Sequence, residues 1–208
     1  MTLIWGRTNS SNVMKLLWFC AEAGIPYERR DAGGTFGLVG DDAYKAMNPM
    51  SLVPVLQEAD GWALWESNTI LRYLAAVQAG TAAALYPAEP RRRAGIERWM
   101  DWQLAHLTPP MTTIFFTHVR IPEAERDWPA TTAALEKATG LWRLLDRQLA
   151  GRQHVEGDFS LADIAIGIFV HRWFALPVER PELAHLRAWY DRLLARPHYS
   201  RIVAVPMS

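Results

Sequence analysis

The nine residues NPMSLVPVL, at positions 48–56, carry the most specific local signal in the chain. Leu52 to Leu56 has the apolar composition of a β-strand, but Pro54 stands within it. Proline has no backbone N–H to donate to a neighbouring strand, so Pro54 belongs at the start or at the edge of the strand. A cis Val53–Pro54 bond would leave the N–H and C=O of Val53 free to pair with a bound peptide. An ordinary edge-strand proline is the alternative, because trans is the commoner isomer.

The residues before this stretch predict a β-α-β unit. Residues 2–5 are short, β-branched and aromatic, as in a strand. From Asn12 the apolar side chains recur at helical intervals until Gly24 supplies a stop, and a second strand is predicted to begin after Pro26. This order favours a pair of parallel strands joined by a right-handed crossover.

Two more strands and one helix complete the predicted first domain. The strand at residues 52–56 is followed by a turn and by a second strand at 62–65. A helix begins near Glu66, keeps one apolar stripe and ends at Gly80. We therefore expect a small mixed α/β domain in residues 1–80.

The composition and the apolar pattern of the sequence change after the first domain. Residues 81–90 are small and contain proline, which predicts a linker. Residues 91–208 show a succession of helical apolar stripes, which predicts an all-helical domain. Within it, Thr108-Pro109-Pro110 should kink or break a helix, because proline removes a backbone donor. The spacing of Ser160 and Asp163 predicts a capping box at the start of another helix.

Composition excludes several classes of function. The chain has 208 residues, half of them hydrophobic, and its 22 basic and 22 acidic residues balance, so no nucleic acid or anionic membrane is expected as a partner. No window approaches the roughly 20 apolar residues of a membrane span, and no signal-peptide pattern is present, so a cytoplasmic protein is expected. The histidines lack paired spacing, so no metal site is expected. The single cysteine, Cys20, is expected to be a small buried hydrophobe.

The pair Glu66-Ser67 stands at a predicted helix start. A serine there caps backbone donors, and the positive end of the helix dipole attracts carboxylates. The neighbouring Glu66 carboxylate suits an ammonium group. The two sites together fit the α-amino-acid end of a small ligand, with simple helix capping as the alternative.

The order and spacing of these features resemble the cytosolic glutathione transferases. The features are the strand, polar turn and helix at the start, the Asn-Pro-x-x-x-Val-Pro segment, the Glu-Ser helix start and the Ser-x-x-Asp box. The resemblance covers essentially the whole chain and is closest to bacterial members with a serine-type active site, theta- or zeta-like. It implies a thioredoxin-like N-terminal α/β domain that binds glutathione, followed by an all-α C-terminal domain that carries the pocket for a small electrophile. It also implies a homodimer, glutathione as the co-substrate and a role in detoxification.

The resemblance implies roles for two pairs of residues in the first domain. Val53 and a cis Pro54 contact the cysteinyl backbone of glutathione. Glu66 and Ser67 hold its γ-glutamyl end.

The glycine end of glutathione is less well defined by the resemblance. Leu52 departs from the family, because many relatives have a polar residue directly before the Val-Pro pair. The glycine carboxylate must therefore find other donors, and the candidate is the stretch at residues 33–37, which includes Phe36. Ser160 and Asp163 match the folding box of the family and are expected to be structural.

Residues 8–12, TNSSN, form the polar turn between the first strand and the first helix. In the family, a hydroxyl or amide here donates a hydrogen bond to the sulfur of glutathione, whose thiolate is the nucleophile. Such donors lower the pKa of a thiol from about 8.5 towards neutral, and each pKa unit takes only about 1.4 kcal/mol. Matching Lys15 to the basic residue in the first helix of serine-type relatives places Ser10 at their catalytic serine, with Ser11 and Asn12 as alternatives. The turn has no cysteine, which argues against thiol-disulfide chemistry.

The expected function is that of a glutathione transferase, which activates the glutathione thiolate for attack on small electrophiles. One alternative is a non-catalytic glutathione-transferase-like module for binding or interaction. Another is glutathione-dependent peroxide reduction or dehalogenation, which uses the same thiolate. The hydroxyl-rich turn favours an enzyme, because a carrier has little need of thiolate donors.

Overall fold

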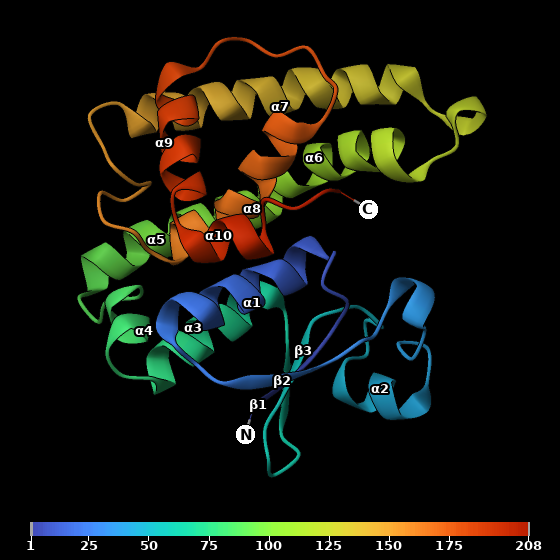
Figure 1. Cartoon of the computed structure of the whole chain (residues 1–208), viewed down its shortest axis with the longest axis vertical. Coiled ribbons are helices and arrows are strands. Elements are labelled where there is room, and N and C mark those ends of the chain that lie inside the picture. Colours follow the sequence, from blue (N-terminus) through green and yellow to red (C-terminus); the bar gives the residue numbers. More distant parts are fainter. Residues whose placement is uncertain (1, 208) are drawn as a thin grey trace. The chain divides into compact units, whose positions relative to one another are not determined.

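The computed structural model describes residues 2–207, which divide into two compact units (Figure 1). The first unit ends at Tyr86 and the second begins at Pro87. Both residues lie within the stretch expected to be a linker. That stretch has secondary structure of its own, because α4 (Thr81–Ala84) lies in it and Pro90 opens the next helix.

The first unit is built on a four-stranded sheet with the order β2-β1-β3-β4. Strand β1 (Thr2–Trp5) pairs in parallel with β2 (Tyr27–Arg30) and antiparallel with β3 (Val55–Gln57). Strand β3 pairs antiparallel with β4 (Ala63–Trp65). Helix α1 (Ser11–Ala23) connects the two parallel strands, so the predicted β-α-β unit is confirmed.

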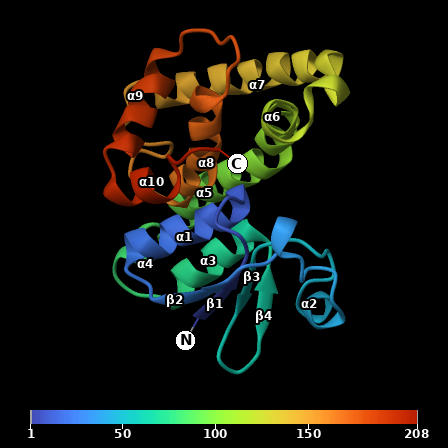
Figure 2. The same cartoon turned by 45° about the vertical axis from the view of Figure 1, so that its right-hand side comes forward.

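Helices lie on both faces of this sheet (Figure 2). Helix α3 (Ser67–Val77) packs against α1 on one face, where Ile4 of β1 is fully buried. Helix α2 (Asp42–Met47) lies on the other face, where the next residue of β1, Trp5, meets the ring of Tyr44 edge to face. The alternation of side chains along a strand therefore gives the unit two apolar layers.

The strand expected from residue 52 starts later, at Val55. Ser51 has a positive φ of 54°, and Pro54 cannot donate to the ladder, so pairing begins only after the proline. The prediction that Pro54 stands at the start of a strand is confirmed. The Val53–Pro54 peptide bond is cis.

The second unit is helical throughout its named elements, as predicted. These are α5 (Pro90–Trp102), η2 (Gln103–Leu107), α6 (Thr108–Phe115), η3 (Phe116–Arg120), η4 (Glu123–Glu125), α7 (Trp128–Leu149), α8 (Leu161–Ala175), α9 (Ala184–Leu194) and α10 (Pro197–Ile202). The thioredoxin-like α/β unit and this all-α unit together form the fold class that the sequence predicts.

The chain does not break at Thr108-Pro109-Pro110, although regular α-helix is interrupted directly before these residues. The chain continues from α5 into α6 through the π-helical segment η2, and Leu107 and Thr108 both keep right-handed helical dihedral angles. Thr108 donates to the carbonyl oxygen of Gln103 from both its backbone N–H and its hydroxyl, the latter at 2.9 Å. Because the wider turn takes up the local misfit, the two prolines occupy the first positions of α6, where a missing N–H costs little.

The predicted capping box at the start of α8 is confirmed. The Ser160 hydroxyl accepts from the N–H of Ala162 at 3.3 Å, and the Asp163 carboxylate accepts from the N–H of Ser160 at 3.0 Å. Asp163 is fully buried and also accepts from the indole N–H of Trp189 at 2.9 Å. These side chains hold the second unit together, as the folding-box interpretation expected.

Candidate functional site

The polar turn at residues 8–12 leads directly into helix α1. Ser10 is the N-cap residue, with extended dihedral angles, but its side chain makes no capping hydrogen bond. Across the described residues, the hydroxyls of Ser10 and Ser11 have no protein partner, and Ser10 keeps 9% of its surface exposed. The start of α1 therefore presents unpaired hydroxyls beside free backbone N–H groups, which suits an anion.

Val53 lies beside this turn. A Cβ added to Gly6, at the end of β1, would come within 3.3 Å of the Cβ of Val53 and within 2.4 Å of Val13. Only glycine allows the backbone to pass so close, and Gly6 also has a φ of 151°. The end of β1, the first turn of α1 and Val53 thus meet at one place.

The backbone of Val53 is held in place yet unpaired. The preceding carbonyl oxygen, that of Leu52, accepts from the Tyr44 hydroxyl and from the Asn48 side-chain amide, both at 2.8 Å. Within residues 2–207, no hydrogen bond involves the N–H or the C=O of Val53 itself. Two adjacent unpaired backbone groups on an anchored segment can pair with an extended peptide.

The Glu66-Ser67 pair opens helix α3 without capping it. Glu66 is the N-cap residue, and its side chain makes no capping bond. It is exposed and has a φ of 71°, an unusual backbone conformation for a residue other than glycine, and such conformations gather at binding sites. The alternative interpretation of this pair as a simple helix cap is therefore wrong, and the first N–H groups of α3 are not used by these side chains.

A chain of hydrogen bonds joins the two helix starts. The Ser67 hydroxyl donates to the Asn12 side-chain oxygen at 3.2 Å. The ammonium group of Lys15 donates to the Ser67 oxygen at 3.4 Å and to the Asn68 side-chain oxygen at 3.1 Å. Burial lowers the pKa of Lys15 to about 7, against the opposing influence of the Glu66 carboxylate.

Lys15 and Asn68 are site residues that sequence reasoning missed. Lys15 served there only to align the first helix, and Asn68 was not singled out. The available signal was the position of Lys15 between Met14 and Leu16, where helix α1 is otherwise apolar and buried. A cation in such a place needs partners, and these come from a segment more than 50 residues away in the sequence.

The loop at residues 33–37 lies next to these elements. A Cβ added to Gly33 would come within 3.2 Å of Val53, and one added to Gly34 would come within 2.8 Å of the Arg7 guanidinium. Arg7, a cation that the sequence analysis did not consider, therefore lies over the loop. Phe36 is 52% exposed in the 3-10 turn η1 (Gly34–Phe36), and no described contact ties it to the other predicted site residues.

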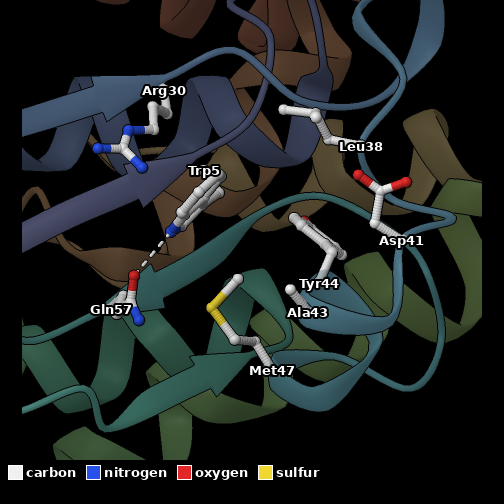
Figure 3. A pocket seen from close by; sticks show the side chains of 8 residues that line it. All are labelled: Trp5, Arg30, Leu38, Asp41, Ala43, Tyr44, Met47 and Gln57. Carbon is white, nitrogen blue, oxygen red and sulfur yellow. Dashed lines mark hydrogen bonds between the residues drawn. The ribbon is translucent and has the colours of Figure 1, made fainter.

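A separate hollow of about 430 Å³ lies on the α2 face of the sheet (Figure 3). Trp5, Tyr44 and Met47 form its apolar surface, and Arg30 and Asp41 stand towards opposite ends of it. None of the residues predicted to bind glutathione lines this hollow. It is therefore distinct from the place where the turn, Val53 and the start of α3 meet.

Cys20 is a structural residue, as expected. It is 1% exposed within α1, and burial raises the pKa of its thiol to about 12. A thiol with so high a pKa is not a nucleophile near neutral pH.

Among residues 2–207, no helix is both long enough and apolar enough to cross a membrane. The same residues contain no group of three or more histidine, cysteine or acidic side chains that could hold a metal ion.

Comparison with known proteins identifies the class that this fold and site define. The family model described as "Glutathione S-transferase, N-terminal domain" matches residues 9–77. Glutathione S-transferase GstB of Escherichia coli strain K12 is 40% identical over 210 residues, with 100% of both chains covered. Glutathione S-transferase 3 of Zea mays is 27% identical, with 97% of this chain and 92% of the maize protein covered. The chain therefore belongs to the glutathione S-transferase family.

A solved structure has the same fold. The theta class glutathione S-transferase from the citrus canker pathogen Xanthomonas axonopodis pv. citri, with glutathione bound, superposes with a TM-score of 0.93. It is 46% identical to this chain, with 100% of this chain and 99% of that protein covered. The sequence-based predictions of a glutathione transferase and of its two-part architecture are confirmed.

Proposed function

We propose that this enzyme binds glutathione on its first unit and activates the thiol with hydroxyls of the polar turn, as a serine-type transferase. The observation that carries the proposal is the meeting of three unsatisfied groups at one place. These are the backbone of Val53, the hydroxyls at the start of α1 and the uncapped start of α3. Each suits a different part of one small peptide.

The middle of glutathione pairs with Val53, next to Pro54. The N–H and C=O of Val53 exchange hydrogen bonds with the cysteinyl backbone, as an added strand does at a sheet edge. The γ-glutamyl end reaches the start of α3, where the Ser67 hydroxyl and the free N–H groups meet its carboxylate and Glu66 meets its ammonium group. The glycine carboxylate lies towards Arg7 and the loop that carries Phe36.

The cysteinyl sulfur then lies at the start of α1, where Ser10 is the principal donor and Ser11 and Asn12 are its neighbours. A hydroxyl hydrogen bond and the helix dipole stabilise the thiolate, which lowers the pKa of the thiol. The thiol proton leaves to solvent. The sulfur lone pair forms a bond to an electrophilic carbon. Either a leaving group departs with its electron pair, or a double bond opens and its other end takes up a proton from solvent.

We also propose the properties that the resemblance implies for the whole enzyme. The helical unit binds the electrophile, the chain acts as a homodimer in the cytoplasm, and the reaction serves detoxification. Light scattering of the purified protein tests the dimer, because a particle near the chain mass of 23.6 kDa at micromolar concentration would contradict it.

The activity is tested by incubating the purified enzyme with glutathione and a panel of electrophiles, with product masses as the readout. Alkyl and aryl halides, activated alkenes and hydroperoxides belong in the panel. Conjugates with the mass of glutathione plus electrophile support the proposal. Glutathione disulfide alone would indicate peroxide reduction, and no product with any member would indicate a binding module.

A further inference from the structure

Lys15 is a charged group in an unusual position. It is fully buried in the middle of α1, between Met14 and Leu16, whereas the other lysines, Lys45 and Lys137, are exposed. An unpaired ammonium group in such a place would cost several kcal/mol, so its polar contacts are required for folding or for function. Those contacts include Ser67 and Asn68, at the start of α3.

The chemistry of the three groups fixes the direction of their hydrogen bonds. In its protonated form Lys15 can only donate, so the Ser67 oxygen accepts from Lys15 and the single Ser67 proton points to the Asn12 oxygen. Because the Asn12 oxygen faces Ser67, the NH₂ group of Asn12 is directed elsewhere and can donate to another acceptor. Lys15 thus leaves Ser67 to act through its one proton, which serves either the Asn12 oxygen or a bound carboxylate.

Glutathione needs hydrogen-bond donors both at its γ-glutamyl carboxylate and at its sulfur. On binding, the Ser67 hydroxyl turns from the Asn12 oxygen to donate to the γ-glutamyl carboxylate, and a sulfur anion beside the polar turn accepts from the Asn12 amide. A cation that donates to the Ser67 oxygen also polarises the hydroxyl, which strengthens its bond to a carboxylate.

We propose that Lys15 is a positioning residue for glutathione, which orients the Ser67 hydroxyl as a donor and acts as the buried counter-charge of the γ-glutamyl carboxylate. The inference rests on the proposed glutathione site. It extends that site beneath the surface, to a residue that does not touch the ligand.

The charges around Lys15 give this role a measurable signature. Glu66, at the start of α3, raises the pKa of Lys15, while burial lowers it more, and the result is about 7. In the first unit, α3 and α4 pack against α1. Helix α3 adds one charged residue, Arg72, and the titratable Tyr73, whose hydroxyl donates to Glu58, while α4 has no charged residue.

A carboxylate bound at Ser67 brings a new negative charge near Lys15 and favours its protonated form. The pKa of Lys15 then rises above 7, so binding near pH 7 takes up a fraction of a proton. Ionisation of the glutathione thiol would release a proton and mask this uptake. S-methylglutathione has no thiol, so it reports the uptake alone.

The test is calorimetric titration of the full-length enzyme with S-methylglutathione at pH 7, in two buffers of different ionisation enthalpy. Wild type should bind with net proton uptake. Lys15→Arg, whose side chain stays protonated, should bind with an affinity within a few fold of wild type and without proton uptake. Lys15→Met should bind about tenfold or more weakly, the cost of losing a charge-assisted hydrogen bond, and also without uptake.

Lys137→Met, a change at an exposed lysine of the second unit, is the matched control and should bind as wild type does. Unchanged affinity in a folded Lys15→Met enzyme, or proton uptake that persists in Lys15→Arg, would overturn the inference. If Lys15→Met does not fold, as judged by circular dichroism, the proton uptake of Lys15→Arg decides alone. Wild type that binds no S-methylglutathione would instead refute the glutathione site itself.

Discussion

Helices α3 and α8 each begin with a serine and an acidic residue, but the two pairs serve different purposes. At α8, Ser160 and Asp163 accept hydrogen bonds from the N–H groups of their own helix start, and both are buried. At α3, Glu66 is exposed and caps nothing, and the Ser67 hydroxyl bonds to Asn12 of another helix. The first N–H groups of α8 are therefore paired with side chains of α8 itself, whereas the first N–H groups of α3 remain available to a ligand.

The comparison shows how a structural pair differs from a binding pair of similar composition. A helix whose own side chains satisfy its first N–H groups has nothing left to offer a ligand. A helix whose serine is engaged elsewhere retains both the N–H groups and the positive end of its dipole. The difference lies in hydrogen-bond partners and not in residue type.

The largest effect is expected at the satisfied helix start. Asp163→Ala should lower the free energy of unfolding by about 3–5 kcal/mol, because it removes a buried carboxylate that accepts from Ser160, Val155 and Trp189. Urea denaturation measures the change. The glutathione affinity of the molecules that remain folded should be unchanged, and a specific loss of affinity would show that α8 also contributes to binding.

Ser10→Ala should have the next largest effect, and on turnover. If Ser10 donates to the thiolate, its loss should raise the pKa of bound glutathione by about one unit and lower turnover near neutral pH about tenfold. The loss should shrink as the pH rises towards the ordinary thiol pKa of about 8.5, because bulk deprotonation then supplies the thiolate. The readout is the pH profile of kcat.

Ser11→Ala and Asn12→Ala, measured in parallel, show which of the three side chains is the principal donor to the thiolate. Wild-type turnover in Ser10→Ala, together with a large loss in one neighbour, would move the principal donor to that neighbour. Wild-type turnover in all three would remove the polar turn from catalysis.

Replacing Glu66 is expected to have smaller effects: the stability of the enzyme is kept or raised, whereas its affinity for glutathione falls. Glycine tolerates a φ of 71°, so Glu66→Gly should keep the stability of the enzyme or raise it by up to about 1 kcal/mol. Glutathione affinity should fall about fivefold, because an exposed ion pair with the ligand ammonium is worth at most about 1 kcal/mol. Glu66→Ala is the control, since it removes the carboxylate but keeps the backbone strain. A drop in stability in both variants would mean that Glu66 is structural.

Features of the structure that depend only on residues close together in the sequence could be predicted from the sequence. The Ser160–Asp163 box spans four residues and was predictable from spacing alone. Gly24 ends α1 in the left-handed conformation, with its N–H bonded to the carbonyl oxygen of Cys20, as its place after the apolar stripe suggested.

Features that depend on distant partners could not be predicted. The burial of Lys15 requires Ser67 and Asn68, and a periodicity argument assigns a lysine to solvent. The positive φ of Glu66 is set by tertiary structure and not by its residue type. The helix across Pro109 and Pro110 survived because a π-helical turn accommodates them, which is not visible in a pattern of single residues.

The contrast between the two helix starts is tested most directly by glutathione calorimetry on wild type, Ser67→Ala and Ser160→Ala side by side. Ser67→Ala should weaken binding by about 1–3 kcal/mol, because it strips a hydrogen bond from a charged carboxylate. Ser160→Ala should keep the wild-type affinity and lose only about 1 kcal/mol of stability, as removal of an N-cap serine does. Equal glutathione affinities for wild type and Ser67→Ala would contradict the assignment of the α3 start as the γ-glutamyl site.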